Sequence, residues 1–470
     1  MKTAQKTDKK TLFESMPVPQ AVATMAIPTI ISQLINLIYN MADAFFIGRT
    51  GNSYMMAATS LTLTLTMLNV AFSNLFGVGG GSLVARLMGA GKDDRARAVS
   101  AYSVFGSLLL AAVYSILIGL FLDPVLFFLG ASEATIGFAR QYASLVIVLG
   151  SLPAILSHAL AHLLRNTGFS SQASMGLSGG GLLNIALDPL FMFVLMPPGY
   201  EVVGAAAATL LSNVLACAYL FFAYHKASKT SPLSLDFSLV RNVERESKKS
   251  LFAVGIPSAL LTGLFDLANI CVNIIASSHS DLVLAGMGIV MKVERLPNAI
   301  NVGLSQGMLP IVAYNYSSGN HDRMKKTIRF TRICGLSVAT VSILLLELFA
   351  RPVTHVFLST RSAQDAAAAI ATIGFATHFL RIRAVASPVQ FLNYSCSFTM
   401  QAMGFGKATL LHAFVRELVF YIPLMFLLDR LFGETGLACA LPAGEGLGAV
   451  FAMLLLAYLL KREGAVSSAK

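Results

Sequence analysis

The chain has 470 residues, of which 56% are hydrophobic and only 12% are charged, and its mean hydropathy is +0.71. This composition excludes an ordinary soluble globular protein, in which apolar and charged residues are more evenly balanced. The net charge of +11 does not indicate nucleic-acid binding, which would need a basic face on a soluble domain; membrane topology and lipid headgroups account for it. The sequence therefore predicts an all-α polytopic membrane protein.

Apolar runs of about 20 residues recur along the chain, and each is long enough to cross ~30 Å of hydrocarbon. Twelve transmembrane helices are predicted, at residues 21–47, 54–80, 99–122, 138–163, 178–196, 203–224, 251–275, 283–313, 330–350, 366–396, 408–429 and 438–460. The eighth and tenth are long, so we expect them to be tilted or broken. The five cysteines lack the spacing of a metal site, and no cofactor is expected.

Lysine and arginine residues gather in the loops on one side of the predicted membrane. These loops carry Lys2, Lys6, Lys9, Lys10, Lys92, Arg95, Arg97, Lys226, Lys229, Arg241, Arg245, Lys248, Lys249, Arg323, Lys325, Lys326 and Arg329, whereas the opposite loops carry only Arg49, Arg351, Arg361 and Arg430. By the positive-inside rule the basic side is cytoplasmic. The basic N-terminal segment shows no cleavage site of a signal peptide, so both termini are expected in the cytoplasm.

The chain also repeats itself at an interval of about 228 residues. The stretch GVGGGSLVARLMGAGKDDRAR (77–97) aligns with GLSQGMLPIVAYNYSSGNHDRMKK (303–326), which pairs Gly79 with Gly307, Ala85 with Ala313, Gly91 with Gly319, Asp94 with Asp322 and Arg95 with Arg323. Pro28 likewise aligns with Pro257. Two pseudo-symmetric six-helix bundles of one orientation follow, with a substrate cavity expected between them.

The expected domain organisation follows from this repeat. The segments are a cytoplasmic N-terminal segment at 1–20, an N-terminal bundle at 21–224, a cytoplasmic linker at 225–250, a C-terminal bundle at 251–460 and a cytoplasmic tail at 461–470.

Polar side chains follow one face of the first predicted helix and return in the fifth. The first helix places Gln33, Asn36, Tyr39, Asn40 and Asp43 on one stripe, and the fifth places Asn184 and Asp188 four residues apart, because residues three and four apart share a helix face. An ionised carboxylate in mid-membrane costs roughly 2.5–3.5 kcal/mol on insertion scales, so it needs partners, water or a function. The two helices run in the same direction, which predicts both acids at similar depth in the outer half of the N-terminal bundle.

Two carboxylates in one low-dielectric cavity repel each other and so favour the uptake of a proton. Asn184, Tyr39 and backbone oxygens could instead complete an oxygen cage for Na⁺ around Asp43 and Asp188. The residues leave H⁺ and Na⁺ open as the bound cation. The alternative is that the acids only hydrogen-bond neighbouring helices, although a pair at matched depth favours a cation site.

Six motifs together resemble the multidrug and toxic compound extrusion family of transporters, closest to the branch that includes DinF and MepA. They are YNMADAFFIGRTG (39–51), LFGVGGGSLVARLMGAG (75–91), LLNIALDPLFMF (182–193), VGAAAATLLS (203–212), GLSQGMLPIVAYNY (303–316) and RELVFYIPL (416–424). The resemblance implies a V-shaped pair of six-helix bundles in the bacterial cytoplasmic membrane, exporting cationic aromatic amphiphiles in exchange for H⁺ or Na⁺. It also implies a cation-coupling role for Tyr39, Asp43, Asn184, Asp188 and Thr209. We expect a monomer and no enzyme.

Some branches of this family carry an acid in the seventh or tenth helix. Here the seventh helix has Asp266, but the tenth offers His378, Arg381 and Arg383 and no acid at comparable depth, which argues against a C-terminal cation site. The candidates for the substrate cavity are Asn36, Asn40, Asp266, Lys292, Glu294 and Arg295. The last three are interpreted as cavity-lining or inter-bundle contacts, with a charge network that locks one conformation as the alternative.

Other functional classes fit the sequence less well. A flippase for lipid-linked precursors shares the wider superfamily architecture, but would be expected to have several basic residues in its cavity. A major-facilitator transporter should read close to GxxxDRxGRR between helices two and three, where this chain has GAGKDDRARA. His158 and His162 are four residues apart but lack a third ligand, so no metal other than Na⁺ is expected.

Overall fold

The structure is a computed structural model that describes residues 9–355 and 363–467. Part of the expected N-terminal segment (1–8, with Lys2 and Lys6), the loop residue Arg361 and the last tail residues (468–470) lie outside the described residues. All regular elements in the described ranges are helices.

The first half of the chain holds the helices from α1 to η3. These are α1 (Lys9–Glu14), α2 (Val18–Arg49), α3 (Ser53–Gly89), α4 (Asp93–Leu120), α5 (Leu122–Phe128), α6 (Ile136–Ala143), η1 (Ser144–Leu149), α7 (Ser151–Asn166), α8 (Ser170–Leu190), η2 (Phe191–Leu195), α9 (Glu201–Ala227) and the linker turn η3 (Phe237–Asn242). The second half holds α10 (Arg245–His279), α11 (Asp281–Ser317), α12 (His321–His355), α13 (Ala363–Ala384), α14 (Ser387–Met403), α15 (Gly406–Phe414), η4 (Val415–Tyr421) and α16 (Ile422–Ser467).

The twelve predicted spans are all found as helices. In the described part, eight helical segments are long and apolar enough to cross a membrane, and ten are if each of two bent pairs counts as one span. One of the eight, Gly406–Arg462, contains a turn at Gly433 (φ 62°, ψ −147°) and so holds the eleventh and twelfth spans. The eighth span is α11, whose charged residues reduce its hydropathy.

Two spans are bent. The tenth consists of α13 and α14, which meet at 49°, and Pro388 in the first turn of α14 cannot continue the preceding helix. This break was predicted, whereas the eighth span is one continuous helix. The fourth span is also bent, by 45° after Leu149; its sequence gave no such expectation.

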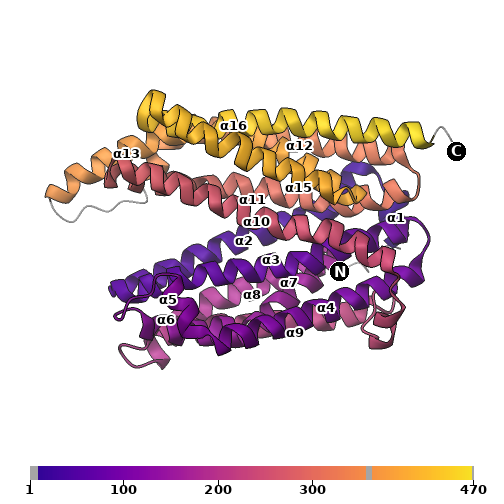
Figure 1. The fold of residues 1–470 in the computed structure, drawn as a ribbon, viewed down its shortest axis with the longest axis horizontal. Coiled ribbons are helices and arrows are strands. Elements are labelled where there is room, and N and C mark those ends of the chain that lie inside the picture. The colour runs from indigo at the N-terminus through magenta and orange to yellow at the C-terminus, as the bar shows by residue number, and fades with distance from the viewer. Residues whose placement is uncertain (1–8, 356–362, 468–470) are drawn as a thin grey trace, which may run out of the picture.

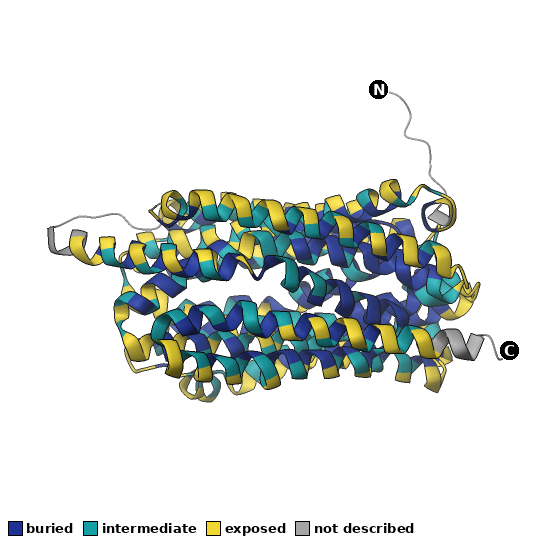
Figure 2. Ribbon diagram, turned by 90° about the horizontal axis from the view of Figure 1, so that it is seen from above, coloured by how far each residue is buried: buried dark blue, intermediate teal, exposed yellow. Residues whose placement is uncertain are grey.

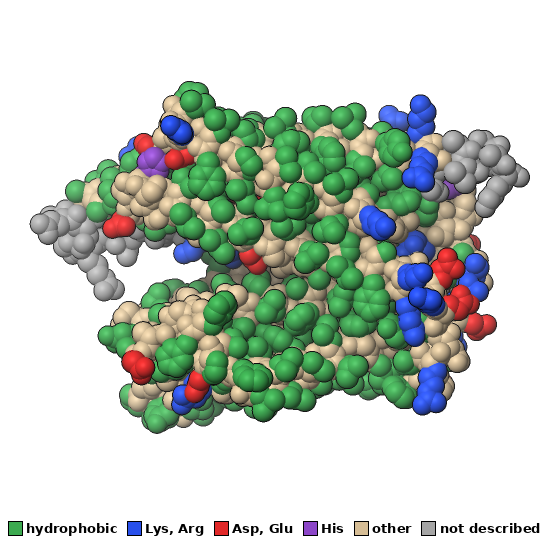
Figure 3. All heavy atoms as spheres, viewed as in Figure 1, with side chains coloured by type: hydrophobic (Ala, Val, Ile, Leu, Met, Phe, Trp, Pro, Cys, Tyr) green, Lys and Arg blue, Asp and Glu red, His purple; other side chains and the backbone are tan. Residues whose placement is uncertain are grey.

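The helices form two bundles that diverge toward one end of the molecule (Figure 1). Figure 3 shows a cleft between the bundles that opens at the end opposite to most of the Lys and Arg side chains, while hydrophobic side chains cover the flanks. Helix α1 and the C-terminal end of α16 are both at the basic end (Figure 1). Arg140, which pairs with Asp123 beyond the end of α4, belongs to the opposite end, so the prediction that only four arginines lie there was wrong.

The closed, basic end is held by two helix crossings related by the internal repeat. Gly79 of α3 packs against α10, where an added Cβ would meet Leu251 O at 2.6 Å and Gly255 Cα at 2.9 Å. Its repeat partner Gly307 of α11 packs against α2, where a Cβ would meet Ala26 Cα at 2.5 Å. Only a residue without a side chain permits backbones to approach this closely. Figure 2 shows buried residues gathered inside the bundles and at this end.

The turns after these crossings confirm the repeat seen in the sequence. Gly91 and Gly319 follow α3 and α11 with φ values of +68° and +78°, a region that residues with a Cβ rarely adopt.

A hydrogen bond from Ser82 Oγ of α3 to Gln401 O of α14, 2.7 Å long, also connects the two bundles.

Candidate cation site in the N-terminal bundle

The acids predicted in the first and fifth spans face each other across α2 and α8. The two helices pack against each other at Gly181, where a Cβ would lie 3.5 Å from the Cβ of Tyr39, in ordinary van der Waals contact. Asp43 and Asp188 interact electrostatically with each other, and Tyr39 interacts with both. Asp188 is fully buried and Asp43 is half-buried.

An amide connects the acid pair to the sixth span. The Nδ2 group of Asn184 donates to Asp188 Oδ1 at 3.2 Å and to Thr209 Oγ1 of α9, also at 3.2 Å. Asn184 and Thr209 are both buried. The structure therefore brings together all five residues assigned to cation coupling from the sequence.

Three oxygen atoms of this cluster are buried without a hydrogen-bond partner among the described residues. They are Asp43 Oδ1, Asn184 Oδ1 and Asp188 Oδ2. Buried polar atoms are normally paired, and each unpaired one costs about 1–3 kcal/mol. Two carboxylate oxygens and an amide oxygen without donors fit a proton or a hard cation such as Na⁺.

Tyr142 of α6 also belongs to the site, although sequence reasoning missed it. Its side chain hydrogen-bonds Thr209 and interacts electrostatically with Asp43, Asp188 and Tyr39. The π-helical segments η1 and η2 begin two residues after Tyr142 and three after Asp188. Such segments are frequent at functional sites, but only Pro189, next to Asp188, hinted at irregular backbone in the sequence.

The polar stripe of α2 continues from the acids toward the other bundle. Gln33 Nε2 donates to Gln306 Oε1 of α11 at 3.2 Å, which shows that this face of α2 points toward the C-terminal bundle. Asn36 and Asn40 are exposed and bond to each other along the helix, with Asn40 Nδ2 donating to Asn36 O at 2.6 Å. Since they share the face of Gln33, they lie on the side of α2 that faces the cleft.

His162 reaches the same inter-bundle contact, since its Nδ1 lies 3.5 Å from Gln306 Nε2. His158 Nδ1 instead contacts Ala154 O at 2.9 Å. Across residues 9–355 and 363–467, no three His, Cys, Asp or Glu side chains gather as a metal site would need.

The cavity candidates of the C-terminal bundle have different surroundings. Lys292 and Arg295 are exposed, and Arg295 interacts with Asp266 of α10. Glu294 forms a two-pronged ion pair with Arg383 of α13, at 2.8 and 2.9 Å. Both partners belong to the C-terminal bundle, so this ion pair does not cross between the bundles.

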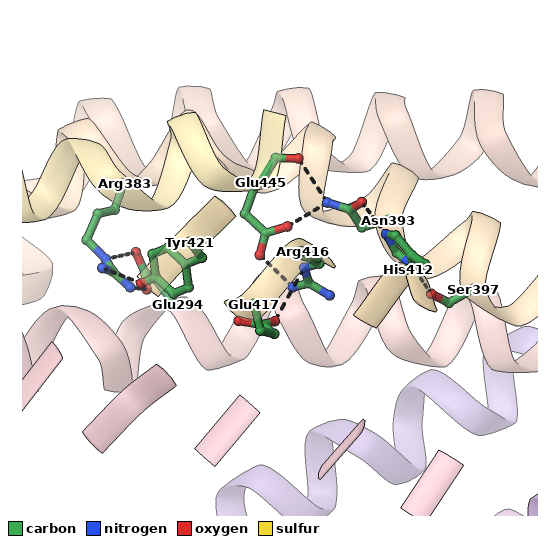
Figure 4. A network of polar contacts seen from close by, with 9 residues as sticks. All are labelled: Glu294, Arg383, Asn393, Ser397, His412, Arg416, Glu417, Tyr421 and Glu445. Atoms are coloured by element: carbon green, nitrogen blue, oxygen red, sulfur yellow. Dashed lines mark hydrogen bonds and ion pairs between the residues drawn. The ribbon is translucent and has the colours of Figure 1, made fainter. Parts of the chain in front are cut away.

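The C-terminal bundle also contains buried acids that the sequence analysis did not select. Glu417 of η4 and Glu445 of α16 flank Arg416, and Figure 4 shows the polar network around them. The signal was present in the sequence, because three charged residues stand in apolar runs at RELVFYIPL and LPAGEGLGAV. These residues lie in the eleventh and twelfth spans, whereas the acids expected from the family lie in the seventh and tenth.

Two pseudo-symmetric helical bundles, a cleft between them and a buried acid pair in one bundle are the architecture of a polytopic membrane transporter. The MatE family model matches residues 28–190 and 257–427, more than half of the chain. The chain therefore belongs to the MatE family, the multidrug and toxic compound extrusion family that its motifs resemble.

Named relatives and solved structures cover nearly the whole chain. It is 31% identical over 451 residues to "Multidrug export protein MepA" of Staphylococcus haemolyticus, with 96% of each chain covered. It is 29% identical over 460 residues to the protein of the same name in Staphylococcus saprophyticus, with 97% of each covered. Its fold is similar to that of a multidrug resistance MATE family transporter in an outward-facing conformation, with a TM-score of 0.87, 22% identity and 98% and 100% of the two chains covered.

Proposed function

We propose that this protein is a multidrug exporter of the bacterial cytoplasmic membrane that exchanges cationic aromatic amphiphiles for H⁺ or Na⁺. The observation that carries the proposal is the group of three buried, unpaired oxygens on Asp43, Asn184 and Asp188. The export function is supported by the names of relatives that align with the chain from end to end. No cofactor is required, and the protein acts as a monomer.

Alternating access accounts for the exchange. The cleft opens away from the basic end, which the positive-inside rule assigns to the cytoplasm. A cation that enters from outside removes the cost of burying two carboxylates and so stabilises the conformation in which the N-terminal bundle closes around them. Bound drug then leaves to the outside.

Dye efflux from proteoliposomes tests this proposal. A pH gradient and a Na⁺ gradient are imposed separately on vesicles that contain the purified protein. We expect efflux of a cationic dye to follow one of the two gradients, and its absence under both would contradict cation-coupled export.

A flippase for lipid-linked precursors remains the second candidate, because Lys292 and Arg295 are exposed basic residues in the C-terminal bundle. A headgroup-flipping assay on the same vesicles distinguishes it. Lipid flipping without dye efflux would favour that function, whereas the buried acid pair favours export of cations.

Drug affinity is expected to fall as the coupling cation is raised. A cation that binds the two conformations with a hundredfold difference in affinity shifts their equilibrium by about 2.7 kcal/mol. Dye binding in detergent, measured by fluorescence polarisation over a range of pH and of Na⁺ concentration, shows how drug affinity depends on each cation. Asp43→Asn should weaken that dependence. An affinity that is independent of both cations in the unmutated protein would show that these residues do not couple cation to drug.

The linker between the bundles is expected to face the cytoplasm. A cysteine at the exposed Ser238, in a background without the five native cysteines, should react with an impermeant thiol reagent only after the cells are opened. The matched control is Glu133→Cys, in the exposed loop before α6, which should react in intact cells. The reverse pattern would overturn the orientation.

A further inference from the structure

The C-terminal bundle contains a buried charge cluster with more carboxylates than cations. Arg416 Nη2 donates to Glu445 Oε1 at 2.5 Å, and Arg416, Glu417 and Glu445 are each at most 5% exposed. Arg416 Nε approaches Glu417 Oε1 only to 3.5 Å and has no hydrogen-bond partner in the described part of the chain. Figure 4 shows Arg416 between the two acids.

The second carboxylate oxygen of Glu445 accepts a hydrogen bond from Asn393, which is itself hydrogen-bonded to His412. Asn393 Nδ2 of α14 donates to Glu445 Oε2 at 2.6 Å and to the backbone oxygen of Glu445 at 3.0 Å. His412 Nε2 lies 3.0 Å from Asn393 Oδ1, and His412 Nδ1 lies 2.9 Å from Ser397 Oγ. Because the amide oxygen of Asn393 only accepts, a neutral imidazole with its proton on Nε2 satisfies both contacts. His412 is also fully buried, and burial disfavours a charged ring, so we take His412 to be neutral.

The neighbouring ion pair supplies no spare cation. Arg383 is engaged by both oxygens of Glu294, and its Nη1 also donates to Tyr421 Oη at 3.4 Å. Tyr421, the hydrogen-bond partner of Arg383, also interacts electrostatically with Glu417. Each arginine thus has its own glutamate, and Glu417 is the one carboxylate of the cluster without a full counter-charge.

The position of Glu417 makes an uncompensated charge expensive. Helix α15 begins at Gly406, beside Lys407, and Glu417 lies about 17 Å further along the helix, close to the middle of ~30 Å of hydrocarbon. A charged side chain there costs several kcal/mol unless it is paired or neutralised. With Arg416 already bound to Glu445, uptake of one H⁺ is the simplest way to remove the charge.

We propose that Glu417 is a proton-binding site of this protein, separate from the Asp43 and Asp188 pair and set by the Arg416 and Glu445 ion pair beside it. The step is the addition of one H⁺ from water to the Glu417 carboxylate, and no other bond is made or broken. The groups that face it are Arg416 on its own element, Glu445 on α16 and Tyr421 with the Arg383 and Glu294 pair behind it. The aromatic ring of Tyr394 lies 5.3 Å from the Arg416 guanidinium.

Infrared spectroscopy of the purified protein tests proton binding directly, because a protonated carboxyl group has its own C=O stretch. A pH titration should show protonated-carboxyl absorption that is lost in Glu417→Gln. Glu347→Gln is the matched control, since the side chain of Glu347 on α12 is 41% exposed and lies 3.6 Å from Arg381; its spectrum should equal that of the unmutated protein. An unchanged spectrum in Glu417→Gln would overturn the proposal.

A second variant leaves Glu417 in place. In Glu445→Gln, Arg416 loses its counter-charge and Glu417 becomes its only carboxylate partner, so the cluster stays charge-balanced and Glu417 stays ionised. The same protonated-carboxyl absorption should therefore disappear although Glu417 is present. A purely structural role for the network predicts no such loss, and persistence of the absorption in Glu445→Gln would contradict the proposal.

The role of this proton in transport rests on the proposed cation-coupled export, but its binding does not. The double variant Asp43→Asn with Asp188→Asn should stop dye efflux and keep the Glu417 absorption. If dye efflux proves independent of both gradients while the absorption is still lost in Glu417→Gln, the proposed function fails and the proton site stands. If efflux is cation-coupled and the absorption is unaffected by Glu417→Gln, the proton site fails alone.

Discussion

Asp188→Asn is expected to reduce gradient-driven dye efflux to the background rate while the protein still folds and inserts. The asparagine keeps the size of the side chain and an oxygen that can accept the bond from Asn184 Nδ2, which is 3.2 Å long in the unmutated protein. It removes the charge that attracts the cation. A loss of about 2.7 kcal/mol of coupling free energy corresponds to a hundredfold weaker effect of the cation on the conformational equilibrium. Efflux from proteoliposomes under an imposed gradient measures the effect.

The matched control for this change is Asp123→Asn. Asp123 pairs with Arg140 at 2.6 Å, and both side chains are exposed, so the pair contributes little to stability. Efflux by this variant should equal that of the unmutated protein. Normal gradient-driven transport by Asp188→Asn would disprove the assignment of the cation site to the acid pair.

Gly307→Val is expected to prevent closure of the cytoplasmic side. The new Cβ would meet Ala26 Cα at 2.5 Å, and backbone on the facing helix cannot turn aside as a flexible side chain could. Overpacking of this kind costs typically 1–3 kcal/mol, which favours the conformation with the bundles apart at this end by roughly ten- to a hundredfold. Dye efflux should fall correspondingly, since the protein rarely reaches the outward-open state.

The accessibility of Ser82 reports this shift. Ser82 is buried at the closed end and bonds to Gln401 O, so a cysteine there should react with a thiol reagent only when the bundles separate. Gly307→Val should accelerate the reaction, whereas Gly288→Val should not. Gly288 lies in the same helix and a Cβ there would meet nothing within 4 Å, so it controls for the effect of valine on the helix. Equal rates in the two variants would contradict the proposed closure.

Much of this architecture could be predicted because insertion into a membrane requires sequence patterns that are easy to recognise. Hydrocarbon requires about 20 apolar residues in each span, and the repeat revealed two equivalent halves through short motifs such as Gly91 and Gly319. The acid pair was visible for the same reason, since a carboxylate such as Asp188 in an apolar run is expensive. Helix periodicity then placed Asn184 on the same face.

The contacts between helices could not be predicted in this way. Tyr142 joins the cation site through Thr209, but the sequence had no signal that would align helix four with helix six. The pairing of Glu294 with Arg383 could not be predicted either, because spacing along one helix says nothing about which helix lies opposite. The bend after Leu149 likewise arises from local backbone geometry rather than from hydropathy.

The sequence by itself determined the membrane class, the twelve spans, the duplication and the pair of acids at Asp43 and Asp188, because these depend on solvation and on local periodicity. The tertiary structure alone decided which charges neutralise one another. Arg416 stands beside Glu417 in the chain, yet its strong bond is to Glu445 on another helix. That choice depends on distances of a few ångströms between helices distant in sequence, and in a low-dielectric interior those distances determine whether a carboxyl group is paired or left to bind a proton.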